Sequence, residues 1–165
     1  MMKTVQNLSL LNTLWLALAI GLMQPLNAKA ADLPAQVPIV EFGSAQITLK
    51  DVRLTVEYAH NFEQRARGLM HRADLCAQCG MLFEFEYPRT AGFWMKNTLI
   101  PLDIAYIDSD GIIADIKPMY PLVLESVPSS RPVKYALEMN QGWFVKQGII
   151  VGDKMDVVNR SMVSE

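Results

Sequence analysis

The sequence predicts an α+β domain that is mainly β, built as a small, partly closed antiparallel β-barrel with one packed helix. Three observations support this fold class. Short runs of alternating apolar and polar residues recur along the chain, turn-forming residues separate them, and only residues 61–70 show convincing helical periodicity. A short second helical turn is expected near residues 142–147.

The predicted strands follow one another at short intervals from residue 52 onwards. Residues 52–58 alternate strictly between apolar and polar side chains, which is the period of a strand with one buried face. Residues 102–107 and 112–117 flank Asp108-Ser109-Asp110-Gly111, a sequence typical of a hairpin turn. Four further segments are expected to form strands: 81–86, 92–98, 134–139 and 155–158.

The predicted helix has a clear N-terminal signal. Asn61 is a favourable N-cap, and Gln64 stands three residues later, which is the spacing of a capping box. Phe62, Ala66 and Leu69 fall on one helical stripe, and we expect that stripe to face the sheet.

The first thirty residues have the features of a secretory signal peptide. Lys3 precedes an apolar run over residues 8–23, and Ala28-Lys29-Ala30 is a small-x-small cleavage site. The run is shorter than the ~20 apolar residues of a membrane span. We therefore expect cleavage after Ala30 and a periplasmic or secreted protein with no membrane span. The alternative is that the segment stays as an uncleaved anchor.

The rest of the chain divides into two parts. Residues 31–45 begin with a polar, Pro-containing stretch and are expected to form a flexible lead. Residues 46–160 are expected to form a single domain, and their length is sufficient for one hydrophobic core.

Charge and motifs exclude several classes of function. The formal net charge of the 165 residues is −2, and no Lys/Arg block is longer than two, so a nucleic-acid partner is not expected. The chain contains no phosphate-binding P-loop, no GxGxxG, no GxSxG and no HExxH. We therefore expect no cofactor, and no motif identifies a reaction.

Several short motifs follow one another between Leu54 and Val158. They are Arg67–Met70 (RGLM), Gly80–Phe83 (GMLF), Phe93–Thr98 (FWMKNT), Pro101–Asp103 (PLD), Leu137-Glu138 (LE), and Gly148 through Gly152-Asp153. With these motifs the chain resembles DUF192, a bacterial and archaeal family catalogued as a domain of unknown function. The resemblance implies a compact, β-rich single domain that is often exported behind a signal peptide, and it implies no activity.

The two cysteines depart from the family pattern. Cys76 and Cys79 form a CxxC pair, for which an oxidising compartment favours a structural disulfide. A redox-active pair is a second interpretation. A third is a metal site, because His60 and His71 would complete a set of two nitrogen and two sulfur donors suited to zinc.

A group of polar residues in apolar surroundings forms the second candidate site. Lys96 and Asn97 follow Trp94 in an aromatic segment, Asp103 stands in an otherwise apolar run, and Glu138 lies between Leu137 and Met139. One interpretation is structural: the charges form ion pairs or face water. The other is a pocket in which Lys96, Asp103 and Glu138 converge on a small polar ligand beside Trp94.

These observations favour an exported accessory module that binds a small ligand or an envelope protein. One alternative is a small envelope-acting hydrolase or transferase that uses Asp103 and Glu138 for acid–base chemistry. Another is a metal- or thiol-handling protein that uses Cys76 and Cys79. The sequence favours binding over catalysis without deciding between them.

Overall fold

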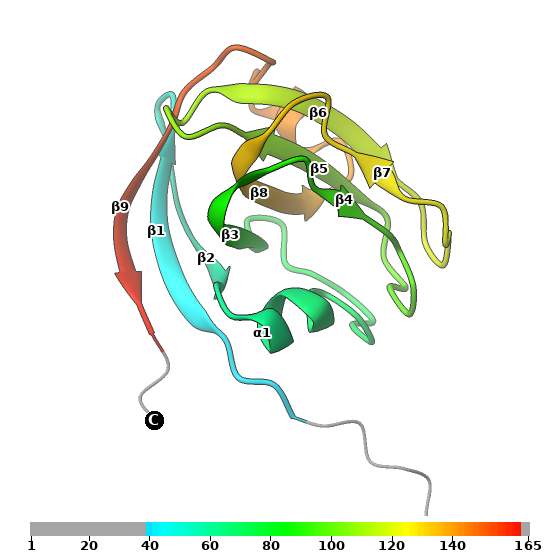
Figure 1. The fold of residues 1–165 in the computed structure, drawn as a ribbon. Helices are drawn as coiled ribbons and strands as arrows, with labels where there is room; N and C mark the ends of the chain where they lie inside the picture. Colours follow the sequence, from blue (N-terminus) through cyan, green and yellow to red (C-terminus); the bar gives the residue numbers. More distant parts are fainter. Residues whose placement is uncertain (1–38, 163–165) are drawn as a thin grey trace, which may run out of the picture. The chain divides into compact units, whose positions relative to one another are not determined.

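A computed structural model describes residues 39–162. The predicted signal peptide lies outside these residues. The elements, in chain order, are β1 (Gly43–Leu49), β2 (Val52–Ala59), α1 (Phe62–Arg67), β3 (Gly80–Arg89), β4 (Gly92–Phe93), β5 (Leu102–Ile107), β6 (Ile113–Met119), β7 (Val127–Pro128), β8 (Val133–Asn140), α2 (Trp143–Lys146) and β9 (Met155–Ser161). The protein is mainly β, as the sequence predicts, with two short helices (Figure 1).

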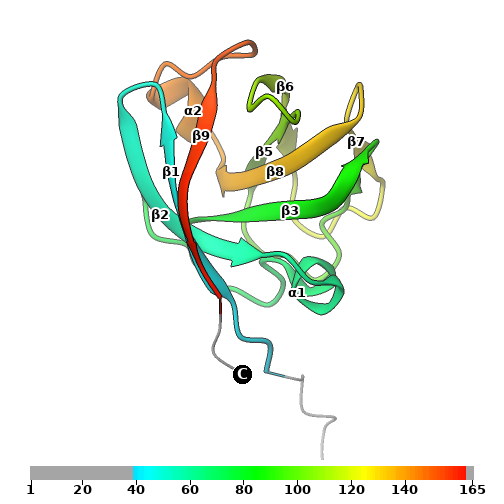
Figure 2. The ribbon, with the colours of Figure 1, turned by 60° about the vertical axis from the view of Figure 1, so that its left-hand side comes forward.

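Seven strands form one mixed sheet in the order β6-β5-β8-β3-β2-β1-β9. Two short strands, β4 and β7, form a separate sheet. The pair β2–β3 is parallel, because the chain between them passes through α1 and a long loop before it re-enters the sheet (Figure 2). The other strand pairs are antiparallel.

The prediction of a partly closed antiparallel barrel is therefore wrong in two respects. The sheet is mixed, and over residues 39–162 it does not close into a barrel. The segments that lead into the edge strands β6 and β9 are joined by an isolated bridge between Ile112 and Lys154. Alternation along a strand reports which side chains are buried, but it carries no information on strand direction or on closure.

Both faces of the central strands are buried. All six residues of β5 are buried, and its side chains alternate between two hydrophobic clusters. Ala105 and Ile107 belong to one cluster, whereas Leu102, Ile104 and Tyr106 belong to the other. A polar side chain on a central strand consequently enters one of two separate apolar environments.

Helix α1 begins as predicted but faces a different way. Asn61 is the N-cap, and its side chain and that of Gln64 form the complete capping box. However, Gln64 is the buried residue, 4% exposed, whereas Phe62 is 81% exposed. Of the predicted apolar stripe, Leu69 packs into the core, whereas Phe62 and Ala66 are exposed. Gln64 is held inward because its amide donates to the Glu41 carbonyl while its oxygen accepts from the His60 backbone N–H.

The helix is also shorter than the predicted span of residues 61–70. It ends at Arg67, and Gly68 follows with a φ of +48°, a backbone conformation that favours glycine. The predicted second helical turn is confirmed as α2, a four-residue helix preceded by Gly142. Over the described part of the chain, no helix is long and apolar enough to span a membrane.

The predicted strand at residues 92–98 forms only in part. β4 ends at Phe93, and the chain then turns, with Asn97 at a φ of +56°. Its backbone bonds instead to a neighbouring loop: the Met95 N–H donates to the Val123 carbonyl and the Leu122 N–H to the Thr98 carbonyl. Trp94 and Lys96 therefore lie on a loop, and strand alternation does not determine where they point.

Replacing Gln64 with alanine should lower the free energy of unfolding by ~1–3 kcal/mol, because it removes the hydrogen bonds that Gln64 makes to Glu41 and to the N-terminus of α1. Urea unfolding followed by circular dichroism measures the loss. The matched control is Glu63→Ala, which changes the neighbouring exposed position of the same helix. Equal stability of the two variants would contradict the structural role of Gln64.

Candidate functional site

Glu138 is a buried carboxyl on the face of the sheet that carries the cluster of Leu102, Ile104 and Tyr106. It lies on β8 opposite Met81 of β3 and Ile104 of β5, and it is 5% exposed. Burial raises the pKa of its carboxyl to about 8, and no neighbouring cation or hydrogen-bond donor in the described residues opposes that shift. The raised pKa favours the protonated, neutral form of Glu138 at pH 7.

Asp103 points to the other side of the same sheet. It lies opposite Met139 on β8, one residue along from the position of Glu138, so the two carboxyl groups emerge on opposite faces. An oxygen of Asp103 accepts a 2.7 Å hydrogen bond from the Gly142 backbone N–H. Asp103 thus holds the turn that leads into α2.

The loop after β4 carries the remaining predicted residues. The Lys96 ammonium lies 5.3 Å from the centre of the Trp94 ring, and both side chains are exposed. The Asn97 carbonyl accepts a 2.8 Å hydrogen bond from the His71 N–H. The structure thus brings Lys96 and Trp94 together, but it does not bring Lys96, Asp103 and Glu138 to a shared pocket.

Two adjoining hollows lie near Trp94. The first, which we call the aromatic groove, has a volume of about 280 Å³ and is lined by Phe62, Arg65, Ala66, Phe85, Arg89, Ala91, Gly92, Phe93 and Trp94. The second, the polar hollow, has a volume of about 420 Å³ and is lined by Tyr58, His60, Asn61, Phe62, Arg65, Glu84, Phe85, Glu86 and Lys134. They share three lining residues and therefore lie side by side next to α1, and we call the two together the depression beside Trp94.

Packed aromatic rings form the floor of the aromatic groove. The Phe93 ring makes edge contacts with Phe83, at 4.9 Å between ring centres, and with Phe85, at 6.4 Å. The guanidinium carbons of Arg65 and Arg89 each lie 5.9 Å from the centre of the Phe85 ring. Cation–π contact of this kind places two positive charges at an apolar surface.

Glu84 is the hub of the charge network that borders the polar hollow. It accepts a 2.6 Å hydrogen bond from the Tyr58 hydroxyl and a 2.9 Å bond from Arg160, and the Lys134 ammonium lies 3.3 Å away. Burial by itself would raise the pKa of Glu84, but these partners lower it below its usual value. Glu84 is thus held as a carboxylate, in contrast to Glu138.

His60 stands at the same hollow. Its ring stacks on Tyr58, with 5.2 Å between the ring centres. Its Nδ1 atom is buried and has no hydrogen-bond partner among the described residues. Burial, together with the hydrogen bond to Glu84, raises the pKa of the Tyr58 hydroxyl far above its ordinary value, so Tyr58 stays a neutral donor.

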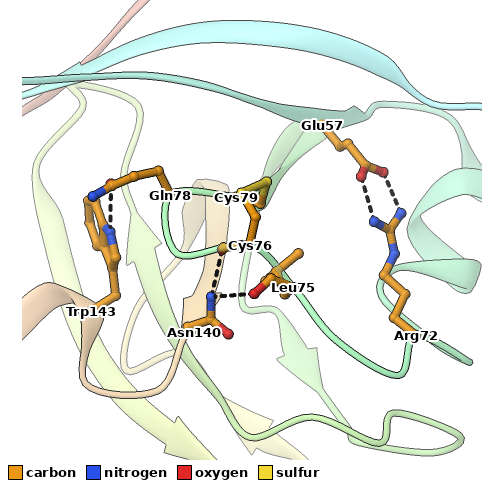
Figure 3. The surroundings of a disulfide bond; sticks show 8 residues. All are labelled: Glu57, Arg72, Leu75, Cys76, Gln78, Cys79, Asn140 and Trp143. Atoms are coloured by element: carbon orange, nitrogen blue, oxygen red, sulfur yellow. Dashed lines mark hydrogen bonds and ion pairs between the residues drawn. A yellow bond between two sulfur atoms is a disulfide. The ribbon is translucent and has the colours of Figure 1, made fainter.

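The cysteine pair lies in a loop that packs against the C-terminal end of β8, at Asn140. The sulfur atoms of Cys76 and Cys79 lie at disulfide distance, 2.09 Å apart (Figure 3). The Asn140 amide donates to the carbonyls of Leu75 and Cys76, at 3.2 and 2.8 Å, and the Trp143 indole N–H donates to Gln78 at 3.0 Å. The loop is thereby fixed against the end of β8 and α2.

The structure does not assemble the proposed four-donor metal set. His60 stacks on Tyr58 beside the polar hollow, the two sulfur atoms are paired with one another, and the His71 backbone bonds to Asn97. Within residues 39–162, no three His, Cys, Asp or Glu side chains lie close enough together to hold a metal ion.

The chain matches one family over residues 45–157: DUF192, described as uncharacterized ACR, COG1430. The chain belongs to the DUF192 family. The resemblance drawn from GMLF, FWMKNT and PLD is thereby confirmed. None of the curated proteins compared with the chain matches it. DUF192 is a family of unknown function, so membership carries the fold and no activity.

Two solved structures are similar to this DUF192 protein. One is a protein from Sinorhizobium meliloti 1021 provisionally described as a transcription regulator, with 36% identity, a TM-score of 0.69 and coverage of 73% of this chain and 98% of that one. The other is a protein of unknown function from Novosphingobium aromaticivorans DSM 12444, with 32% identity, a TM-score of 0.64 and coverage of 74% and 94%.

Sequence reasoning identified Trp94 but missed most residues of the depression beside it. Phe62 was expected in the core, and Phe85 stood in a predicted strand without any functional signal. Arg65 likewise stood in the predicted helix without any functional signal. The residues that line the aromatic groove approach one another because α1 lies beside β3 and β4. No local sequence pattern predicts that arrangement.

The pKa of Glu138 predicts a specific pH dependence of stability. Because the folded-state pKa is raised, folding takes up a proton between the unfolded pKa near 4.5 and the folded pKa near 8. This contribution is fully present below pH 4.5 and is lost as the pH rises to about 8, at up to ~1.4 kcal/mol per pH unit. Urea unfolding of the wild type at pH 5, 6.5 and 8 measures the loss.

In Glu138→Gln this loss should disappear, because a neutral amide takes up no proton. Glu125→Gln, at an exposed position, is the matched control and should keep the pH dependence of the wild type. The same pH dependence in Glu138→Gln and the wild type would show that Glu138 does not carry it.

Proposed function

We propose that this DUF192 protein is an exported accessory module of the cell envelope that binds a small polar ligand or a partner protein at the depression beside Trp94. The observation that supports this most is that an aromatic groove and a polar hollow adjoin one another, with Phe62, Arg65 and Phe85 lining both. Aromatic walls with a few charged groups at their edge are typical of ligand sites.

Exposure of large aromatic side chains supports the same proposal. Phe62 and Trp94 are 81% and 50% exposed, yet both line the aromatic groove. Leaving such rings in water forgoes the free energy of burial, about 1.5–3 kcal/mol for a phenylalanine side chain. A bound ligand would recover part of that free energy.

Catalysis by Asp103 and Glu138 receives no support from the geometry. The two carboxyl groups lie on opposite faces of the sheet, so they do not flank a single substrate. Asp103 already accepts the Gly142 N–H. The binding interpretation needs neither residue, which is why we favour it over a hydrolase or transferase.

Export rests on the N-terminal sequence. The apolar run and the Ala28-Lys29-Ala30 site favour secretion, and a closed Cys76–Cys79 pair is in keeping with an oxidising compartment. The localisation we propose is the periplasm or the medium.

Export makes a direct prediction about the mature N-terminus. Mass spectrometry of the protein from the periplasm or medium should identify Ala31 as its first residue, because signal peptidase requires small residues before the cut. Ala30→Trp should accumulate unprocessed, whereas Ala35→Leu, which lies beyond the cut, should be processed normally. Recovery of the full-length wild type in the cytoplasm would overturn the proposed localisation.

Binding is tested by nuclear magnetic resonance titration of the mature protein with a panel of amino acids, short peptides and cell-wall sugars. A ligand should shift the Trp94 indole signal and the amides around Phe62 and Phe93. Trp94→Ala should weaken binding about tenfold or more by removing one wall of the groove. Val158→Ala, an exposed apolar position on β9, is the control. Shifts confined to other parts of the protein would contradict the proposed site.

A further inference from the structure

The aromatic groove is positively charged as well as apolar. Its lining contains two arginines, Arg65 and Arg89, and no acidic side chain. A third cation, Lys96, lies over the Trp94 ring, which is itself one wall of the groove. Two acidic residues, Glu84 and Glu86, line the adjoining polar hollow instead, and Glu84 is engaged there by Tyr58, Arg160 and Lys134.

Neither groove arginine is neutralised by a carboxylate in the described part of the chain. Arg65 donates to two backbone carbonyls, those of His60 and Glu84, which carry no net charge. Arg89 is exposed, and the contact found for it is with the Phe85 ring. A guanidinium group has five N–H donors in a planar fork, so donors of Arg65 remain free for a ligand.

The size of the groove limits what its apolar part can take. Its volume of about 280 Å³ is at the lower end for small-molecule sites, which favours one aromatic or branched apolar group over a large ligand. The floor formed by Phe85 and Phe93 offers edge and face contacts to such a ring. Arginine next to an aromatic surface recognises a planar anion in two-point hydrogen bonds.

We propose that the aromatic groove binds a carboxylate carried by an aromatic or branched apolar group, whose ring or side chain occupies the groove while Arg65 and Arg89 hold the carboxylate. This inference rests on the proposed function and specifies its ligand class. A free carboxylic acid and the C-terminal residue of an envelope peptide both present this chemistry. Lys96, over Trp94, adds positive charge at the rim of the groove.

The test uses three small probes with the mature protein. N-acetyl-L-phenylalanine carries both ring and carboxylate, N-acetyl-L-phenylalanine amide lacks the charge, and N-acetylglycine lacks the ring. We expect only the first to shift the Arg65 and Arg89 side-chain N–H signals together with the Trp94 indole signal. Its affinity should fall as salt is raised, because exposed charges are screened.

Variants separate the guanidinium contribution from that of the fold. Arg89→Gln should weaken binding of N-acetyl-L-phenylalanine about tenfold or more, since a charge-assisted hydrogen bond is lost. Arg67→Gln removes an arginine of the same helix as Arg65 that does not line the groove, and it should bind as the wild type does. Unchanged circular dichroism spectra establish that both variants fold.

Two further comparisons distinguish the possible outcomes. A pentapeptide ending in phenylalanine that binds more tightly than the free acid identifies a peptide C-terminus as the ligand, and equal affinities identify the free acid. Equal binding of the amide and the acid would overturn the carboxylate assignment while leaving the proposed function in place. Binding of other ligands at Trp94 with none of these probes bound would likewise overturn only the ligand class.

Discussion

The burial of the central strands on both faces determines much of this structure. Every residue of β5 is removed from water, and the first half of β3 and most of β8 are buried as well. A polar residue on such a strand must find a partner within one of two apolar layers or lose its charge. Asp103 follows the first course by accepting the Gly142 N–H, and Glu138 follows the second, since burial keeps it protonated.

The depression beside Trp94 is a consequence of the parallel β2–β3 pair. A parallel connection requires a long crossover, and here it includes α1, the cysteine loop and the chain that leads back into β3. The crossover places α1 next to β3 and the loop after β4, so that Phe62 and Arg65 face Phe85, Arg89 and Trp94 across the groove. The same crossover carries Cys76 and Cys79 to the end of β8 (Figure 3).

Glu84 and Glu138 show that the sequence neighbours of a glutamate do not determine whether it carries a charge in the folded protein. Glu84 and Glu138 both stand among apolar neighbours in the sequence. Glu84 meets a hydroxyl, an ammonium and a guanidinium group, which lower its pKa, whereas the pKa of Glu138 is raised by burial. The groups that lower the pKa of Glu84 are Tyr58 on β2, Lys134 on β8 and Arg160 on β9. All three residues are distant from Glu84 in the sequence.

The sequence by itself determined what depends on local hydrogen-bonding chemistry and on motifs in fixed order: the capping box of Asn61 and Gln64, the turn at α2, the mainly β composition and DUF192 membership. Only the tertiary structure decided the face that α1 buries, the early end of the strand after Phe93 and the separation of Asp103 from Glu138. The reason is that a capping box involves residues three apart, whereas faces, strand direction and pockets are fixed by pairings between segments far apart along the chain.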